Sequence, residues 1–123
     1  MPKLIIACGG REYDNYKVVY NALIDEAPTL VIEGKAPGAD TLVGEACYQL
    51  MIPYIEVPAL WGPKGTPRIR KAGYKRNMLM MKILLKLADN HEKAVIAFPG
   101  DKGTNMMMKI AEQNDVPVRK YGW

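Results

Sequence analysis

Short apolar runs alternate along the chain with longer stretches whose apolar residues recur every three or four positions. A short apolar run bounded by turn residues is typical of a buried strand, and the longer periodicity is typical of an amphipathic helix. The runs predict strands over residues 3–7, 29–33, 54–57, 94–98 and 116–119. The stretches between them predict helices over residues 14–27, 40–50, 74–87 and 104–113.

Alternating strands and helices predict an α/β fold, in which right-handed crossovers give a mainly parallel sheet with helices on both faces. We expect a single Rossmann-like domain with a five-stranded sheet over residues 1–123. A strand order of 3-2-1-4-5 would place the first strand beside the fourth, and ligands of such sheets bind where the order switches, beyond the carboxyl ends of the strands. The turns after the first, second and fourth strands are therefore expected to share one crevice.

The stretch from Ala94 to Met107 has the features of an anion-binding turn. Its apolar strand stops at Pro99 and Gly100, and a helical stretch opens at Thr104. Glycine allows backbone angles that other residues disfavour, so amide N–H groups and the positive end of a helix can meet just beyond the strand. The candidate ligand-binding residues of this turn are Pro99, Gly100, Gly103 and Thr104.

Two other strand-to-helix turns repeat this arrangement. Arg11 directly follows the first of them, and its guanidinium group suits a phosphate. Asp40 in the second can accept a ribose hydroxyl, cap its own helix or do both, and Asp14 or Asn15 can cap the first helix. The candidate ligand-binding residues of these two turns are Gly9, Gly10, Arg11, Gly34, Gly38, Ala39 and Asp40.

Residues 59–73 form a proline- and glycine-rich connection that is longer than most, and such loops often carry function. Trp61 in this loop can stack on a base as a lid residue or pack onto the domain. Arg76 and Asn77 are further candidate ligand-binding residues, because the first turn of the next helix would direct them toward a phosphate, a ribose or a base. The expected core contacts of that helix are Met78, Met81, Leu84, Leu85 and Ala88.

The net charge of +4 favours an acidic partner such as a nucleotide, a phosphate or a nucleic acid. The composition, 49% hydrophobic and 24% charged, is that of a globular domain, and no apolar run is long enough to span a membrane. We therefore expect a cytoplasmic protein. Cys8 and Cys47 are expected to be buried, and with His91 they lack the spacing of metal ligands, so no metal or other cofactor is predicted.

Five motifs carry a family resemblance that covers nearly the whole chain. In chain order they are Gly9-Gly10-Arg11 with Tyr13 and Asn15, the stretch GKAPGAD from Gly34 to Asp40, Pro58-Ala59 with Trp61, Arg76-Asn77 with Met80, and Phe98-Pro99-Gly100 with Gly103, Thr104 and Met107. With these motifs the chain resembles the YspA-type branch of the SLOG superfamily. That superfamily also includes the Lonely Guy phosphoribohydrolases and the Rossmann-like domain of DNA-processing protein A. The resemblance implies a Rossmann-like domain that binds a nucleotide or a nucleotide-derived ligand.

The resemblance also bears on catalysis. Lonely Guy enzymes carry a glutamate that is implicated in cleaving nucleoside monophosphates, and at the matching position this chain has Met107. Because methionine cannot handle a proton, the leading hypothesis is a sensor or sequestering module that binds a nucleotide-derived small molecule without catalysis. The enzyme alternative is an N-glycosidic hydrolase that uses Asp101, Asp40 or Asp14 instead.

Two further expectations concern macromolecular partners. The basic segment from Lys64 to Arg76, with Trp61 and Tyr74 near its ends, gives single-stranded nucleic-acid binding as a second alternative. A homodimer is the other expectation, since relatives commonly pair through helices that flank the site. The methionine-rich helices of this chain can supply the apolar patch that such pairing needs.

Overall fold

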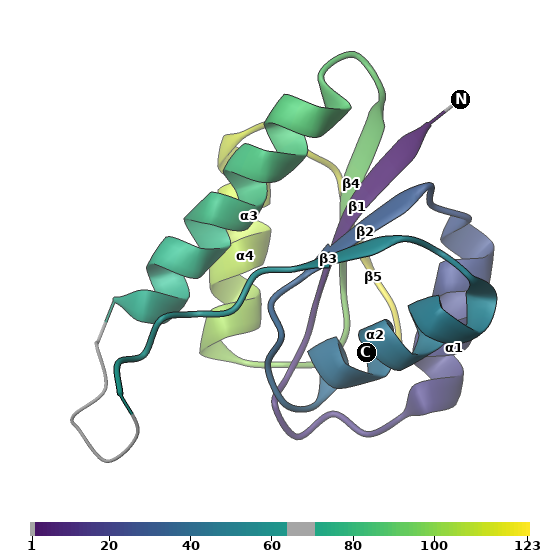
Figure 1. The fold of residues 1–123 in the computed structure, drawn as a ribbon, viewed down its shortest axis with the longest axis horizontal. Coiled ribbons are helices and arrows are strands. Elements are labelled where there is room, and N and C mark those ends of the chain that lie inside the picture. The colour runs from purple at the N-terminus through teal and green to yellow at the C-terminus, as the bar shows by residue number, and fades with distance from the viewer. Residues whose placement is uncertain (1, 64–70) are drawn as a thin grey trace.

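The computed structural model describes residues 2–63 and 71–123, in which strands and helices alternate (Figure 1). The strands are β1 (Lys3–Cys8), β2 (Leu30–Glu33), β3 (Tyr54–Glu56), β4 (Glu92–Ala97) and β5 (Val118–Lys120). The helices are α1 (Tyr16–Glu26), α2 (Ala39–Leu50), α3 (Ala72–Ala88) and α4 (Lys102–Gln113). The predicted α/β class is thus confirmed. No helix in the described part of the chain is long and apolar enough to cross a membrane.

The strands form one parallel five-stranded sheet, as predicted, and their order is β3-β2-β1-β4-β5, the order that would place the first strand beside the fourth. The central strand β1 pairs with β4 along its whole length, from Lys3 opposite Glu92 to Cys8 opposite Ala97. Residues 5–7 of β1 and 94–97 of β4 are fully buried, which explains why both strands are apolar runs in the sequence. Because the strand order reverses between β1 and β4, this pair marks the switch point of the sheet.

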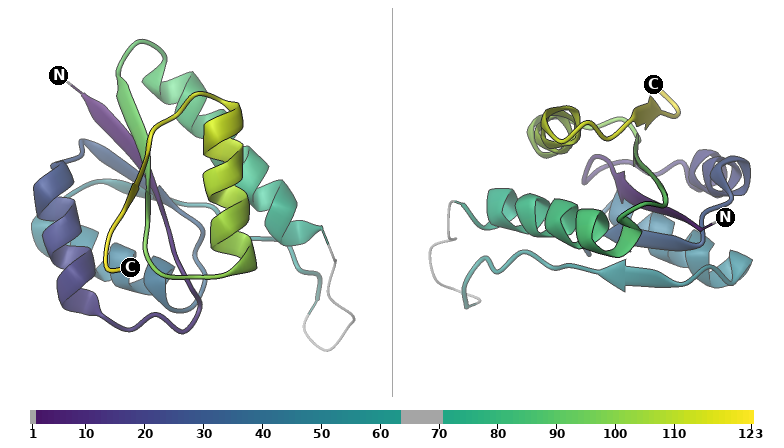
Figure 2. Two further views of the ribbon diagram at one scale, coloured as in Figure 1. Left: turned by 180° about the vertical axis from the view of Figure 1, so that it is seen from behind. Right: turned by 90° about the horizontal axis from the view of Figure 1, so that it is seen from above.

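Helices cover both faces of the sheet (Figure 2). α1 and α2 pack on the face that carries Ile5 and Val31, and the buried ring of Phe98 belongs to the same core cluster. α3 and α4 pack on the opposite face, which carries Ile6 and Val95. Adjacent residues of a strand therefore contribute to different cores, and the fold has two apolar layers that the sheet separates.

The start of α2 differs from the prediction. The helix begins at Ala39, one residue before Asp40, so Gly38 is the N-cap residue. The Asp40 side chain lies in the first helical turn and accepts the N–H of Ala36 at 3.3 Å. Asp40 as an N-cap was therefore a wrong prediction: its carboxylate stabilises the turn that precedes the helix and does not take the capping position.

Other boundaries shift by up to two residues. α3 begins at Ala72 and α4 at Lys102, each two residues before its predicted start. Of the two candidate caps for α1, Asn15 takes the role, because its side chain accepts the N–H of Val18 at 3.3 Å. Such shifts are expected, since the apolar periodicity that predicts a helix does not extend to its polar ends.

A buried carboxylate ties the end of α1 to both β1 and β5. Glu26 is 4% exposed, and its Oε1 lies 2.7 Å from Lys3 Nζ and 2.6 Å from Arg119 Nη2. The hydroxyl of Tyr121 donates to the same carboxylate. Burial alone would raise the pKa of Glu26, but hydrogen bonds from Arg119, Lys3 and Tyr121 lower it to about 2.

Candidate functional site

A small hollow of about 90 Å³ lies at the carboxyl ends of β1 and β4, and we call it the crevice hollow. It is formed by the turn after β1, the start of α2, the first turns of α3 and the start of α4. Its lining residues are Cys8, Gly9, Gly10, Arg11, Ala36, Asp40, Arg76, Asn77, Met80, Asp101, Gly103 and Thr104. The turns predicted to share a crevice thus meet where the strand order switches.

Direct backbone contacts hold these turns together. The N–H of Gly10 donates to the Pro99 carbonyl at 2.8 Å, and the Gly10 carbonyl accepts the N–H of Ala39 at 3.0 Å. Gly38, whose φ is +80°, lies so close to Gly10 and Arg11 that any side chain there would overlap their backbone. The turn after β1 is therefore packed between the other two turns.

The predicted ligand-binding residues divide between the crevice hollow and the contacts around it. Gly9, Gly10, Arg11, Asp40, Arg76, Asn77, Gly103 and Thr104 line the hollow, and so does Asp101 from the enzyme alternative. Gly34, Gly38, Ala39, Pro99 and Gly100 lie in the packed turns beside it. A side chain on Gly34 would meet Asp40 and Arg76, and one on Gly100 would meet Thr104. These two glycines therefore make room for residues that do line the hollow.

Arg76 reaches the crevice hollow from the second turn of α3, not from the first turn as predicted, because the helix begins at Ala72. Its Nη1 donates to the Gly34 carbonyl at 2.7 Å, and its Nε donates to Asn77 Oδ1 at 2.9 Å. Asn77 is buried and donates from Nδ2 to the Gly103 carbonyl at 3.3 Å. The two side chains thus link the turn after β2 to the start of α4.

Arg11 is exposed at the edge of the crevice hollow. Its guanidinium carbon lies 5.5 Å from the centre of the Trp61 ring, within the range of a cation–π contact. The same ring packs against Gly73, whose Cβ position would be 3.1 Å from it. Of the two roles predicted for Trp61, packing onto the domain agrees with these contacts, and the ring also helps to orient Arg11.

Asp40 lies close to both arginines and is largely buried. Burial raises its pKa to about 6, against the opposing effects of Arg76, of two backbone N–H groups and of Arg11. Burial likewise lowers the pKa of Arg76, an effect that Asp40 opposes and Arg11 increases. The two guanidinium groups thus surround a carboxyl group whose charge is lost in mildly acidic solution.

The first turn of α4 forms the remaining side of the crevice hollow. Gly103 and Thr104 lie in this turn, where amide N–H groups have no partner within the helix. Asp101 precedes the helix and makes no capping hydrogen bond with its side chain. Within the described part of the chain, a Cβ on Gly103 would meet no atom within 4 Å. This side of the hollow can therefore receive an acceptor such as a phosphate oxygen.

Sequence reasoning missed three residues of the lining. Met80 lies one helical turn after Arg76, and Ala36 lies inside the GKAPGAD stretch, so spacing and motif could have indicated both. Cys8 ends β1 and is buried, as predicted for both cysteines. Burial raises the pKa of the Cys8 thiol, and Asp40 adds to the rise, so this thiol is not an activated nucleophile.

A second hollow, of about 660 Å³, lies between α2 and the carboxyl ends of β2 and β3, and we call it the β3 hollow. It adjoins the crevice hollow, because Ala36 and Asp40 line both. Its other lining residues are Glu33, Lys35, Pro37, Thr41, Gly44, Glu45, Tyr48, Gln49, Tyr54 and Glu56. Sequence reasoning did not predict it, because its acidic residues stand singly at the ends of short strands and along a helix.

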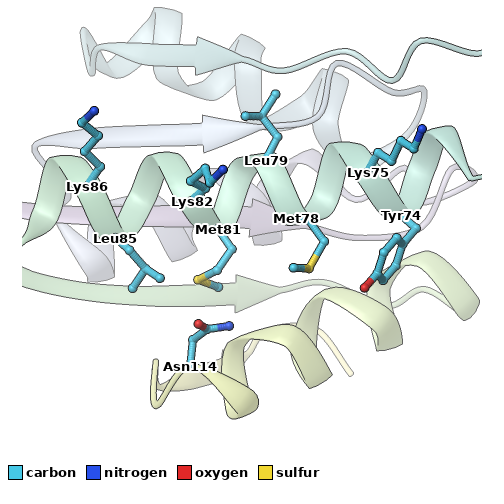
Figure 3. A pocket seen from close by; sticks show the side chains of 9 residues that line it. All are labelled: Tyr74, Lys75, Met78, Leu79, Met81, Lys82, Leu85, Lys86 and Asn114. Carbon is cyan, nitrogen blue, oxygen red and sulfur yellow. The ribbon is translucent and has the colours of Figure 1, made fainter.

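A third hollow, of about 700 Å³, follows α3 beside the end of α4 (Figure 3). Tyr74, Met78 and Leu85 project toward α4, and Leu79 projects to the other side of α3. Met78 is 42% exposed, so its predicted place in the core is wrong. The side chains of α3 that are buried are instead Ala72, Asn77, Met80, Met81, Leu84 and Ala88. The homodimer that such an apolar patch could serve stays a prediction.

Several other residues and segments that were considered from the sequence lie outside the crevice hollow. Met107 is fully buried in the core between the sheet, α3 and α4, and Asp14 is exposed before α1. Among residues 2–63 and 71–123, no three His, Cys, Asp or Glu side chains are grouped to hold a metal ion. Most of the basic segment proposed for nucleic-acid binding, residues 64–70, lies outside the described residues.

The parallel sheet order, the helices on both faces and the crevice at the switch point define an α/β protein of the Rossmann-like class. Among solved structures, the chain is similar to DNA processing protein A (DprA) from Streptococcus pneumoniae, with a TM-score of 0.52 and 18% sequence identity. The match covers 96% of this chain and 58% of that chain, so this chain spans less than two thirds of its neighbour's length. No protein-family model matches the chain, and no curated protein sequence matches it.

At 18% identity, this similarity shows a shared fold alone. It confirms the Rossmann-like fold and, at the level of the fold, the predicted relation to DNA-processing protein A. The YspA-type assignment and the relation to Lonely Guy enzymes stay predictions.

Proposed function

We propose that the chain binds a nucleotide or a nucleotide-derived small molecule, with a phosphate in the crevice hollow, and acts as a sensor or sequestering module. The observation that carries this proposal is the meeting of Arg11, Arg76 and the first turn of α4 at one hollow. Guanidinium groups and the N-terminal amides of a helix both bind phosphate oxygens. The position at the switch point supports the same conclusion, since sheets of this class bind ligands there.

The size of the crevice hollow supports a ligand of which only one end enters. Sites for drug-sized molecules measure roughly 300–1,000 Å³. The crevice hollow measures about 90 Å³, which suits a phosphate group and excludes a whole nucleotide. The rest of the ligand would therefore lie outside, along the wall that Ala36 and Asp40 share with the β3 hollow.

Calorimetric titration with nucleoside monophosphates, cyclic nucleotides and ADP-ribose tests the proposal. Arg11→Gln removes one positive charge at the hollow, and Lys109→Gln removes one from the exposed side of α4 as a matched control. A hydrogen bond to a charged group contributes about 1.5–3 kcal/mol, so Arg11→Gln should weaken binding roughly 10- to 150-fold. Lys109→Gln should bind as the wild type does. If the folded wild-type protein binds none of these compounds, the proposal is wrong.

One observation favours N-glycosidic hydrolysis as a second candidate function. Asp40 lines the crevice hollow and has a pKa of about 6, which suits a group that exchanges a proton near neutral pH. Release of free base from a bound nucleotide, lost in Asp40→Asn while binding persists, would support hydrolysis. Binding without any release of base would leave the sensor or sequestering function alone.

The solved neighbour is a DNA-processing protein by name, so single-stranded oligonucleotides belong in the same titration. Affinity that rises with oligonucleotide length and falls steeply with salt would favour nucleic-acid binding. Affinity that is equal for a mononucleotide and an oligonucleotide would favour the small-molecule site.

A further inference from the structure

The β3 hollow contains two neighbouring carboxyl groups. Glu33 and Glu56 are partners in the register of β2 and β3, so their side chains lie on the same face of the sheet. Glu33 is 1% exposed, and its Oε2 accepts the N–H of Lys35 at 3.0 Å. Its Oε1 has no hydrogen-bond partner among the described residues. Buried polar atoms are almost always paired, so this oxygen needs an explanation.

A proton on Glu33 provides that explanation. Burial raises the pKa of Glu33 to about 8; Asp40 and Glu56 add to the rise, and the N–H of Lys35 opposes it. Protonated Glu33 can donate to Glu56, which then presents an oriented carboxylate at the exposed rim of the hollow. Cys47 of α2 and Arg76 of α3 also interact electrostatically with Glu33.

The β3 hollow also offers aromatic side chains. Tyr48 of α2 is 76% exposed and Tyr54 of β3 is 38% exposed, and both line the hollow. α2 passes beside the Tyr54 ring at Gly44, where a Cβ would lie 3.7 Å from the ring, in ordinary van der Waals contact. Aromatic side chains beside a fixed carboxylate suit a flat heterocycle with N–H donors better than a simple amine, because such a ring can stack as well as donate.

The two hollows are adjacent, and different charged groups line them: the crevice hollow has two arginines with Asp40 and Asp101, and the β3 hollow has three glutamates with Lys35 and Asp40. The crevice hollow brings Arg11 and Arg76 to one side of Asp40, while the β3 hollow places Glu33 and Glu56 on the other. A ligand that spans Asp40 would therefore be anionic at one end and a hydrogen-bond donor at the other. A nucleotide has this polarity, with its phosphate at one end and its base at the other.

We infer that the β3 hollow binds the base of the nucleotide and selects guanine through the carboxylate of Glu56, and this inference rests on the proposed function. Guanine presents a ring N–H beside an exocyclic amino group, and these two donors fit the two oxygens of one carboxylate. Adenine presents an amino group beside a ring nitrogen that is an acceptor, so it offers only one of the two bonds and sets an acceptor against the second oxygen. Glu56 is the binding residue here, and Glu33 is a positioning residue that acts through Glu56.

Titration of GMP, IMP and AMP near pH 7 tests the inference. The wild-type protein should prefer GMP to AMP by about tenfold or more, because a site built to pair donors rejects an analogue that lacks them. IMP, which lacks the exocyclic amino group, should fall between the two. Glu56→Gln should bring GMP and AMP within about threefold of each other, since the amide offers only one acceptor oxygen. Glu112→Gln, an exposed change of equal charge on α4, should keep the full preference.

The pH dependence separates a positioning role of Glu33 from a merely structural one. As the pH rises from about 6.5 to about 8.5, wild-type Glu33 loses its proton, so the preference for GMP should fall. Glu33→Gln keeps a donor toward Glu56 at every pH, so its preference should be constant over this range. A preference that changes equally in both proteins would overturn the role of Glu33.

The outcomes also separate this inference from the function on which it rests. Arg11→Gln should weaken GMP and AMP by the same factor and leave the preference for GMP intact. Equal affinity of the wild-type protein for GMP and AMP would overturn the inference, while the phosphate site would stand. If no mononucleotide binds, the proposed function is wrong and the inference is wrong with it.

Discussion

Replacing Glu33 by glutamine should stabilise the protein at neutral pH. Burial raises the pKa of this carboxyl group from 4.5 to about 8, and Asp40 adds to the rise. At pH 7 the folded chain therefore holds a proton on Glu33, whereas the unfolded chain has lost it. Glutamine is neutral in both states and has nearly the same shape, and its amide group can donate to Glu56.

The size of the effect follows from the two pKa values. Because the folded state binds more protons than the unfolded state between pH 4.5 and about 8, the free energy of unfolding falls as the pH rises through this range. The loss is about 1.4 kcal/mol for each pH unit above 4.5, so it reaches about 3 kcal/mol at pH 7. Glu33→Gln avoids this loss, and its Tm at pH 7 should exceed that of the wild type by on the order of 10 °C.

Urea unfolding of both proteins at several values between about pH 4 and about pH 8, followed by circular dichroism, measures the difference. The stability advantage of Glu33→Gln should grow from near zero at the acidic end to about 3 kcal/mol at pH 7. Glu112→Gln, which changes an exposed carboxyl group at the end of α4, should show no such growth. An advantage that stays constant with pH, or a Glu33→Gln protein that is less stable than the wild type at pH 7, would refute the reasoning.

Three further predictions concern the rest of the fold. Glu26→Gln should destabilise the protein by about 3 kcal/mol at pH 7. When unfolding is measured at a series of acidic pH values, this loss of stability should shrink as the pH falls from 4.5 toward 2. The wild-type carboxylate becomes protonated over this range, and it is then as uncharged as the glutamine of the variant. Gly38→Ala should lower the free energy of unfolding by more than about 1 kcal/mol, because φ is +80° at this residue. Gly103→Ala should keep or raise the free energy of unfolding. Equal melting temperatures of the two variants would contradict this prediction. Cys8 and Cys47 should react slowly with a thiol reagent until urea unfolds the chain, and fast labelling of the native protein would show that they are accessible.

The sheet could be predicted from the sequence because its central strands are buried on both faces. Ile5 and Ile6 lie in opposite cores, and both are fully buried, so β1 has no polar residue that would interrupt the run. The turns could be predicted as well, since Gly9 and Pro99 each directly follow an apolar run. The strand order could not be predicted from the sequence, because pairing joins strands that are distant along the chain; 3-2-1-4-5 is an order common in this class of sheet, and the structure has it.

The roles of single residues were harder to predict, because they depend on contacts between distant parts of the chain. The N–H of Gly10 donates to the Pro99 carbonyl, and the Gly10 carbonyl accepts the N–H of Ala39. A glycine that the sequence indicates as a ligand-binding residue therefore also holds the turns together. Glu33 ends the run TLVIE and looks like an ordinary polar strand end. Its burial arises only when β3 and α2 close around it.

The backbone bonds of Gly10 make the three turns a single pre-organised body. A phosphate that enters the crevice hollow would meet groups that are already in position, so its binding should require little loss of conformational entropy. The same coupling restricts how the protein can be re-engineered. An insertion in any one of these turns would displace the other two, so new specificity is better introduced at the rim of the β3 hollow, where Tyr48 and Glu45 project from a regular helix.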